Sequence, residues 1–144
     1  MVAYADTSFL FSLYAQDTNT VQAGRTAAAV NAPFILTPLQ QHELRNAFRL
    51  SVFRGAITAG ECQGLIDTLE SDIKNGVLCN TPVAWAEVYA EAEALSAAHT
   101  GRLGLRASDV LHVASAMALG AREFYTFDVR QKALAVKVGL KVRP

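Results

Sequence analysis

The segment VAYADTS, residues 2–8, joins a short apolar run to three polar residues that can begin a helix. Val2–Ala5 has the length and composition of a buried strand. The Asp-Thr-Ser triplet at 6–8 consists of residues that are favoured at helix N-caps, and Phe9–Ala15 then continues as a helix. The sequence therefore predicts a strand that ends in an acidic residue and passes directly into a helix.

The same arrangement recurs near the other end of the chain, in REFYTFD at residues 122–128. Glu123–Phe127 predicts a strand, and Asp128 follows it at the start of another helix. The full set of expected strands is Val2–Ala5, Pro33–Leu36, Glu123–Phe127 and Leu140–Val142. The expected helices are Phe9–Ala15, Asn19–Val30, 38–54, 59–74, Ala84–Ala98, Ser108–Leu119 and Val129–Val138. Strands that alternate with helices predict an α/β/α fold with a mostly parallel central sheet, and we expect residues 1–144 to form a single domain.

Two of these helices begin with a capping box, in which a Thr and a Gln or Glu three residues later each accept a hydrogen bond, through the side chain, from the backbone N–H of the other. Thr37 and Gln40 form the first box, with Pro38 at the first helical position. Thr58 and Glu61 form the second box. The helix that follows the second box carries Cys62 on its apolar stripe, which predicts a buried free thiol.

Composition excludes several classes of protein. Of 144 residues, 51% are hydrophobic and 18% are charged, which excludes a disordered chain. The formal net charge is zero, so the surface as a whole is not basic. Two cysteines do not make a disulfide framework, and no apolar run approaches the roughly 20 residues of a membrane span. We therefore expect a cytoplasmic protein without a membrane anchor.

Four acidic residues lie at positions that a structural role alone does not readily explain. Asp6 and Asp128 follow strands, Asp109 lies in the first turn of a helix that is apolar almost all round, and Glu43 lies inside the helix after the second strand. Each has a structural explanation as a cap, a partner of the helix dipole or a surface residue. The carboxyl ends of parallel strands meet at one edge of a sheet, so Asp6 and Asp128 should converge. Clustered carboxylates repel one another unless a cation joins them, and such oxygen ligands suit Mg²⁺ or Mn²⁺.

The order of these motifs resembles the PIN domain family, and by length the single-domain VapC-type toxins of bacterial toxin–antitoxin pairs. The resemblance extends from Val2 to Val142. It is carried by Asp6-Thr7-Ser8, Glu43, Asp109 before LHVASAMALGA, Thr126-Phe127-Asp128, and the closing DVRQKALAVKVGLKV at 128–142. The chain departs from many relatives at Gln131, where they have an aromatic residue.

The resemblance implies a metal-dependent endoribonuclease that uses Mg²⁺ or Mn²⁺ to activate water against phosphodiester bonds in RNA. It implies an RNA substrate, a small antitoxin protein as partner, and a homodimer. The acidic positions of the family fall on Asp6, Glu43, Asp109 and Asp128, and its hydroxyl positions on Thr7 or Ser8 and on Thr126. A non-catalytic PIN-like interaction module is an alternative. A phosphatase with Asp6 as nucleophile is less favoured, because no second carboxylate follows closely.

Charge distribution agrees better with nucleic acid than the net charge does. Residues 61–93 hold seven acidic residues and one basic residue, whereas the rest of the chain holds twelve basic and six acidic residues. Arg45, Arg49 and Arg106 are candidates for contacts with RNA phosphates, although solvated helix faces explain them equally well. His112 follows Asp109 by nearly one helical turn. A core histidine is the favoured interpretation, and a histidine that orients a metal ligand is the alternative.

Overall fold

The computed structural model describes residues 2–144. Within that range the chain forms one sheet of five strands, in the order β3-β2-β1-β4-β5, and every paired strand is parallel to its neighbour. The strands are β1 (Ala3–Ala5), β2 (Phe34–Leu36), β3 (Leu78–Asn80), β4 (Glu123–Tyr125) and β5 (Lys141–Arg143). The predicted α/β class with a parallel sheet is confirmed.

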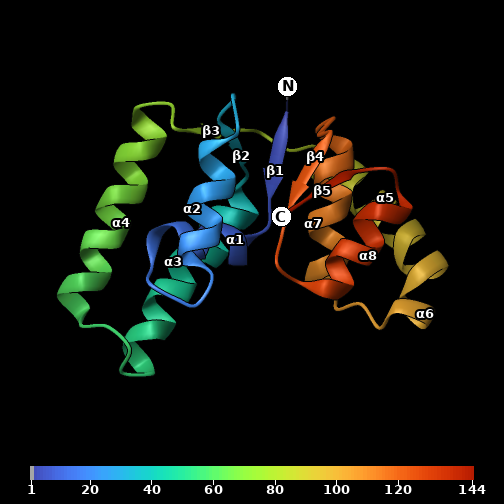
Figure 1. Ribbon diagram of the computed structural model, residues 1–144. Coiled ribbons are helices and arrows are strands. Elements are labelled where there is room, and N and C mark those ends of the chain that lie inside the picture. Colours follow the sequence, from blue (N-terminus) through green and yellow to red (C-terminus); the bar gives the residue numbers. More distant parts are fainter. Residues whose placement is uncertain (1) are drawn as a thin grey trace.

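Helices cover both faces of this sheet (Figure 1). One layer holds α1 (Thr7–Tyr14), α2 (Thr20–Ala28), α3 (Pro38–Phe53) and α4 (Ala59–Lys74). The other holds α5 (Trp85–Leu95), the π-helical turn η1 (Ser96–Thr100), α6 (Gly101–Leu103), α7 (Ala107–Ala118) and α8 (Val129–Lys137).

The core consists of two clusters, one on each face of the sheet, because successive side chains along a strand point to opposite faces. In β1, Ala3 and Ala5 pack with the α1–α4 layer, whereas Tyr4 packs with the α5–α8 layer. In β4, Tyr125 and Phe124 divide in the same way. Successive strand residues point to opposite faces of a sheet, so short strands that are buried throughout can serve two cores at once.

Besides shifts of a few residues in element bounds, the structure differs from the sequence prediction at two larger features. β3 was not predicted, because this edge strand buries only its first residue, Leu78, and so lacks an apolar run. The helix that begins at Trp85 was expected to end near Ala98, but it continues through η1 and α6, with Gly101 inside it. Gly104 ends it instead with φ of +64°, a left-handed conformation that glycine adopts at little cost.

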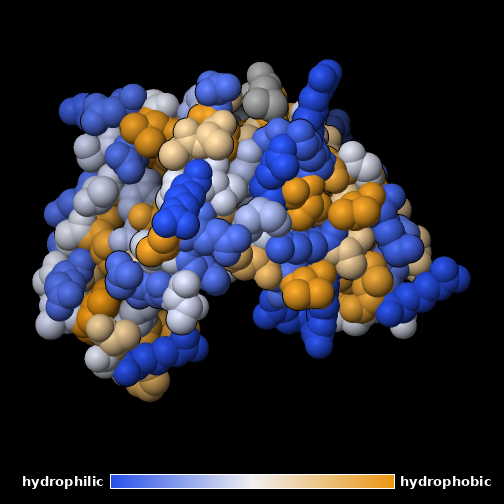
Figure 2. Space-filling model, in the orientation of Figure 1, coloured by the Kyte–Doolittle hydropathy of each residue, from blue (hydrophilic) through white to orange (hydrophobic). Residues whose placement is uncertain are grey.

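The strand order fixes where a ligand can enter. The chain steps outward from β1 through β2 to β3, and then returns to the other side of β1 with β4. β1 and β4 therefore flank the point where the direction of winding reverses, and in open α/β sheets ligands bind beyond the carboxyl ends of the strands at such a point. Figure 2 shows a hollow there, between the α3 and α8 sides of the molecule, bordered largely by hydrophilic residues.

Candidate active site

Asp6 follows β1. Of the four acidic residues that were singled out in the sequence, only Asp109 is more deeply buried. It caps α1, with Oδ1 accepting from the backbone N–H of Phe9 at 2.8 Å. Its Oδ2 accepts from the hydroxyls of Ser8 at 3.0 Å and Thr126 at 2.6 Å. Burial raises the pKa of Asp6 above its usual range, although the hydrogen bonds from Thr126 and Phe9 oppose that rise. The carboxylate is thus a helix cap that is also held rigidly at the strand end.

Thr126 joins the ends of β1 and β4. Its hydroxyl donates to Asp6 and accepts from the backbone N–H of Asp128 at 3.0 Å. Asp128 in turn caps α8, because its Oδ1 accepts from the backbone N–H of Gln131 at 2.8 Å. The predicted strand to Phe127 ends earlier, at Tyr125, and this leaves Thr126 free to turn its hydroxyl toward Asp6.

Asp109 begins α7 and is bound closely by Arg106. Its Oδ2 accepts from the backbone N–H of Arg106 at 3.0 Å and from Nε at 3.1 Å, and its Oδ1 accepts from a terminal guanidinium nitrogen at 3.1 Å. The same nitrogen lies 3.5 Å from Oδ2 of Asp128. One guanidinium therefore bridges two of the four carboxylates.

Glu43 enters the site from α3 and is compensated by a histidine. Its Oε1 lies 2.7 Å from Nε2 of His112 and accepts from the Thr7 hydroxyl at 2.8 Å. Burial alone would raise the pKa of Glu43, but the hydrogen bond and charge of His112, with the Thr7 hydrogen bond, lower it below its usual range. His112 is buried, as a core histidine would be, and it also contacts a candidate ligand.

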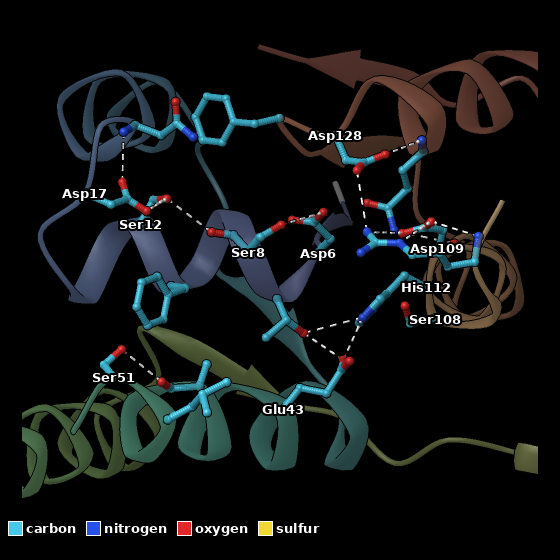
Figure 3. Close-up of a pocket in the computed structure, with 18 of the residues that line it drawn as sticks. Asp6, Ser8, Ser12, Asp17, Glu43, Ser51, Ser108, Asp109, His112 and Asp128 are labelled. Atoms are coloured by element: carbon cyan, nitrogen blue, oxygen red, sulfur yellow. Dashed lines mark hydrogen bonds and ion pairs between the residues drawn. The ribbon is translucent and has the colours of Figure 1, made fainter. Parts of the chain in front are cut away.

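These side chains line one pocket of about 550 Å³. Figure 3 shows Asp109 and Asp128 on the same side of the pocket, Asp6 near them with its carboxylate turned toward Ser8, and Glu43 and His112 meeting on the adjacent wall. Thr7, Ser8, Arg106 and Gln131 also line the pocket, and Thr126 lies buried behind Asp6. Within residues 2–144, no three carboxylate, histidine or cysteine side chains are arranged around a single point as the ligands of one metal ion.

The predicted arginines occupy different positions. Arg106 lines the pocket. Arg45 bonds Gln41 and faces Glu70 of α4 at 3.9 Å, and Arg49 is exposed on α3. Arg54, which caps the C-terminal end of α3, also lines the pocket. Gln131 is buried, and its Oε1 has no hydrogen-bond partner among the described residues.

Comparison with known proteins agrees with this architecture. A search of curated protein sequences found no significant match. VapC20 of Mycobacterium tuberculosis, described as a sarcin–ricin loop cleaving toxin, superposes with a TM-score of 0.69 at 19% identity over 99% of both chains. VapBC2 of Rickettsia felis, bound to a DNA fragment from its promoter, gives 0.67 at 16% identity over 99% of this chain and 98% of that chain. FitAcB of Neisseria gonorrhoeae gives 0.63 at 16% identity over 99% and 97%. The profile of the PIN domain matches residues 3–137, and the chain therefore belongs to the PIN domain family.

Proposed function

We propose that this protein is a metal-dependent endoribonuclease that hydrolyses phosphodiester bonds in RNA. The observation that carries the proposal is the gathering of Asp6, Glu43, Asp109 and Asp128 in one pocket at the reversal point of the sheet. Membership of the PIN family supports it, as does the description of the similar VapC20 as a toxin that cleaves the sarcin–ricin loop.

The residues of the pocket fit a hard divalent cation in their chemistry. They offer carboxylate and hydroxyl oxygens, which suit Mg²⁺ or Mn²⁺, and a positive group already lies between two of them, since Arg106 bridges Asp109 and Asp128. Asp6, Asp109 and Asp128 would be the main ligands, with Glu43 as a further ligand or as the acceptor of a bound water. A bound ion lowers the pKa of its water and offsets charge on the phosphate.

The protein's own residues hold these oxygens in place. Thr126 and Ser8 fix one oxygen of Asp6, and the Phe9 N–H fixes the other. On the opposite wall, Thr7 and His112 hold Glu43. Such supporting hydrogen bonds orient metal ligands and are costly to remove. At the rim, Arg54 and Arg106 provide positive charge for an RNA phosphate, and Arg45 and Arg49 extend that charge along α3.

The proposal is tested with protein that has been stripped with chelator and supplied with RNA. Cleavage should require Mg²⁺ or Mn²⁺ and should be lost in Asp6→Asn and Asp109→Asn, while the matched control Asp67→Asn, on the exposed side of α4, should cut at the wild-type rate. Cleavage in excess chelator, or in both site variants, would refute it. Hydrolysis of a small phosphate ester without RNA cleavage would favour the phosphatase, and metal binding without hydrolysis of either substrate would favour a non-catalytic module.

We further propose that the chain is the toxin of a type II toxin–antitoxin pair whose small antitoxin covers this pocket. An arginine or lysine of the partner would pair with the carboxylates, which is the strong charge-assisted type of contact. Phe11, Ala47 and Leu50 give the pocket an apolar side, and Phe53 at the end of α3 is 87% exposed. Expression with the neighbouring reading frame of its native operon should yield a complex that does not cut RNA. Recovery of the chain alone, or of an active complex, would contradict this proposal.

A homodimer is proposed from the family resemblance alone. Sedimentation at micromolar concentration should give twice the 15.5 kDa mass of the chain. A monomer at that concentration would contradict the proposal. No helix in residues 2–144 has the length and hydropathy needed to cross a membrane.

A further inference from the structure

Arg106 is the cation of the carboxylate cluster in this structure. Its guanidinium makes two hydrogen bonds to Asp109 and approaches Asp128 at 3.5 Å. The exposed fractions of the partners differ greatly: the Arg106 side chain is 66% exposed, whereas Asp109 is 4% exposed and Asp128 is 31% exposed. The carboxylates are thus fixed by the fold, and the guanidinium is held mainly by the carboxylates.

The backbone of Arg106 supports Asp109 independently of its side chain. The Arg106 N–H donates to Oδ2 of Asp109 at 3.0 Å, as part of the start of α7. This contact does not involve the guanidinium, so Asp109 is held in place by the backbone as well as by the side chain of Arg106. Gly104, with φ of +64°, ends the preceding helix, and Arg106 is in extended conformation, so the side chain projects from a short connection and not from inside a helix.

Charges in the pocket otherwise pair unevenly. Glu43 faces His112, and Asp6 forms no ion pair within residues 2–144. A single guanidinium therefore offsets two carboxylates, Asp109 and Asp128, with one positive charge. A divalent ion bound by the same two carboxylates supplies twice that charge, and it needs the oxygens that the guanidinium occupies.

We propose that Arg106 is a displaceable internal cation, which competes with the divalent metal for Asp109 and Asp128 and leaves them when the metal binds. This inference rests on the proposed function, because it concerns the same carboxylates. It assigns Arg106 two positions: one across Asp109 and Asp128, and one turned outward at the pocket rim. The exchange limits how tightly the site binds metal, since each binding event must break the Arg106 contacts.

Calorimetric titration with Mn²⁺ tests the competition without any RNA. Arg106→Gln removes the competing charge and should bind Mn²⁺ about fivefold more tightly than wild type, which is the scale of an exposed ion pair. Arg102→Gln is the matched control, because Arg102 is exposed on α6, outside the pocket, and its removal changes the net charge equally. Arg106→Lys keeps the charge but lacks the two-pronged guanidinium, so its affinity for Mn²⁺ should lie between those of the wild type and Arg106→Gln.

Two further measurements separate displacement from a structural role. In chelator, Arg106→Gln should melt below wild type, and saturating Mn²⁺ should remove the difference; a difference that persists in Mn²⁺ would overturn the proposal. The side-chain Nε–H resonance of Arg106 should shift when Mg²⁺ is added, as its bond to Asp109 breaks.

The outcomes distinguish this inference from the proposed function. If the wild type binds Mn²⁺, and Arg106→Gln binds it no more tightly than Arg102→Gln does, then the competition is overturned. The nuclease proposal still stands in that case. Absence of Mn²⁺ binding in every variant overturns both the metal requirement and the competition. Tighter binding in Arg106→Gln than in Arg102→Gln supports the inference.

Discussion

The imidazole of His112 lies 2.7 Å from the carboxylate of Glu43, so a side chain of α7 holds a side chain of α3 across the end of the sheet. The other ring nitrogen, Nδ1, lies 2.8 Å from the hydroxyl of Tyr4, which is fully buried in β1. His112 thereby connects the hydrophobic core to the pocket. Glu43 is oriented from behind by a residue that the solvent scarcely reaches.

Replacement of His112 by phenylalanine should keep the ring volume and lower RNA cleavage by about 10- to 100-fold, the usual effect of removing a supporting partner of a metal ligand. His112→Gln should recover part of the rate, because its amide can donate to Glu43. Cleavage is measured at equal folded fraction, as judged by circular dichroism. Tyr4→Phe, which loses only the contact behind the imidazole, is the control and should mainly lower stability. An unchanged rate in His112→Phe would contradict the positioning role.

Asp6→Asn should raise the melting temperature at pH 7 in chelator, even though it abolishes the proposed activity. Burial raises the pKa of Asp6 in the folded protein, whereas in the unfolded chain it lies near its ordinary value of about 4. Between these two pKa values the folded state binds more protons, so wild-type stability falls as the pH rises through that window. The advantage of the variant should therefore shrink toward pH 4. Thermal melts across pH 4–8, with Asp67→Asn as control, measure this; a lower melting temperature for Asp6→Asn at pH 7 would contradict it.

The two capping boxes should respond differently to mutation. Thr37 is buried and accepts from the Gln40 N–H, and the Gln40 side chain bonds both the Thr37 N–H and the carbonyl of Ala5, next to Asp6. Thr37→Ala should cost about 1–2 kcal/mol of unfolding free energy, and Gln40→Ala about 1–3 kcal/mol for each buried group left unpaired. Both should also slow RNA cleavage, because α3 carries Glu43.

The control for this pair is the exposed box of α4. Thr58→Ala removes an equivalent hydrogen bond to Glu61 and should cost about 1 kcal/mol with no change in cleavage rate. Urea unfolding gives the free energies, and initial rates of cleavage give the activities. Equal activity losses from Thr37→Ala and Thr58→Ala would show that helix stability, and not the link to β1, governs the rate.

Alkaline pH should unfold the protein through its buried tyrosines. Burial raises the pKa of Tyr4, and burial together with the hydrogen bond to Asp72 raises that of Tyr14. An acid whose pKa is raised by folding destabilises the fold as the pH rises past its unfolded value, about 10 for tyrosine. Absorbance at 295 nm should therefore show these phenols ionising together with the loss of helical circular dichroism. Ionisation of all four tyrosines while the helices remain intact would contradict the prediction.

The sequence predicted the parts of this molecule that depend on local patterns. The apolar run before Asp6 and the capping box at Thr37 and Gln40 are local, and both lie where they were expected. β3 was not predicted, because an edge strand with one buried residue has no such pattern. Asp6 and Asp128 could be placed together from the rule for parallel strands alone, whereas only the family resemblance placed Glu43 in the same site as them.

Compensation of charge in the pocket could not be predicted. The sequence suggested that four carboxylates would repel one another unless a metal joined them. In the structure Arg106 bridges two of them and His112 faces Glu43. The contact between residues 43 and 112 depends on how two helices pack, and the contact between Arg106 and Asp128 depends on where α8 begins. Neither leaves a signal in the spacing of residues.

The pairing of β1 with β4 has a consequence for folding during synthesis. Thr126 and Asp6, which bond to each other, are 120 positions apart in the chain, and contacts at such long range are the slow ones in folding. On the ribosome, Asp6 emerges early and waits through the synthesis of nearly all of the domain before the strand that completes its pocket exists. We therefore expect nascent chains that stop before Glu123 to be harmless to RNA, so that cutting begins only when the last strands dock.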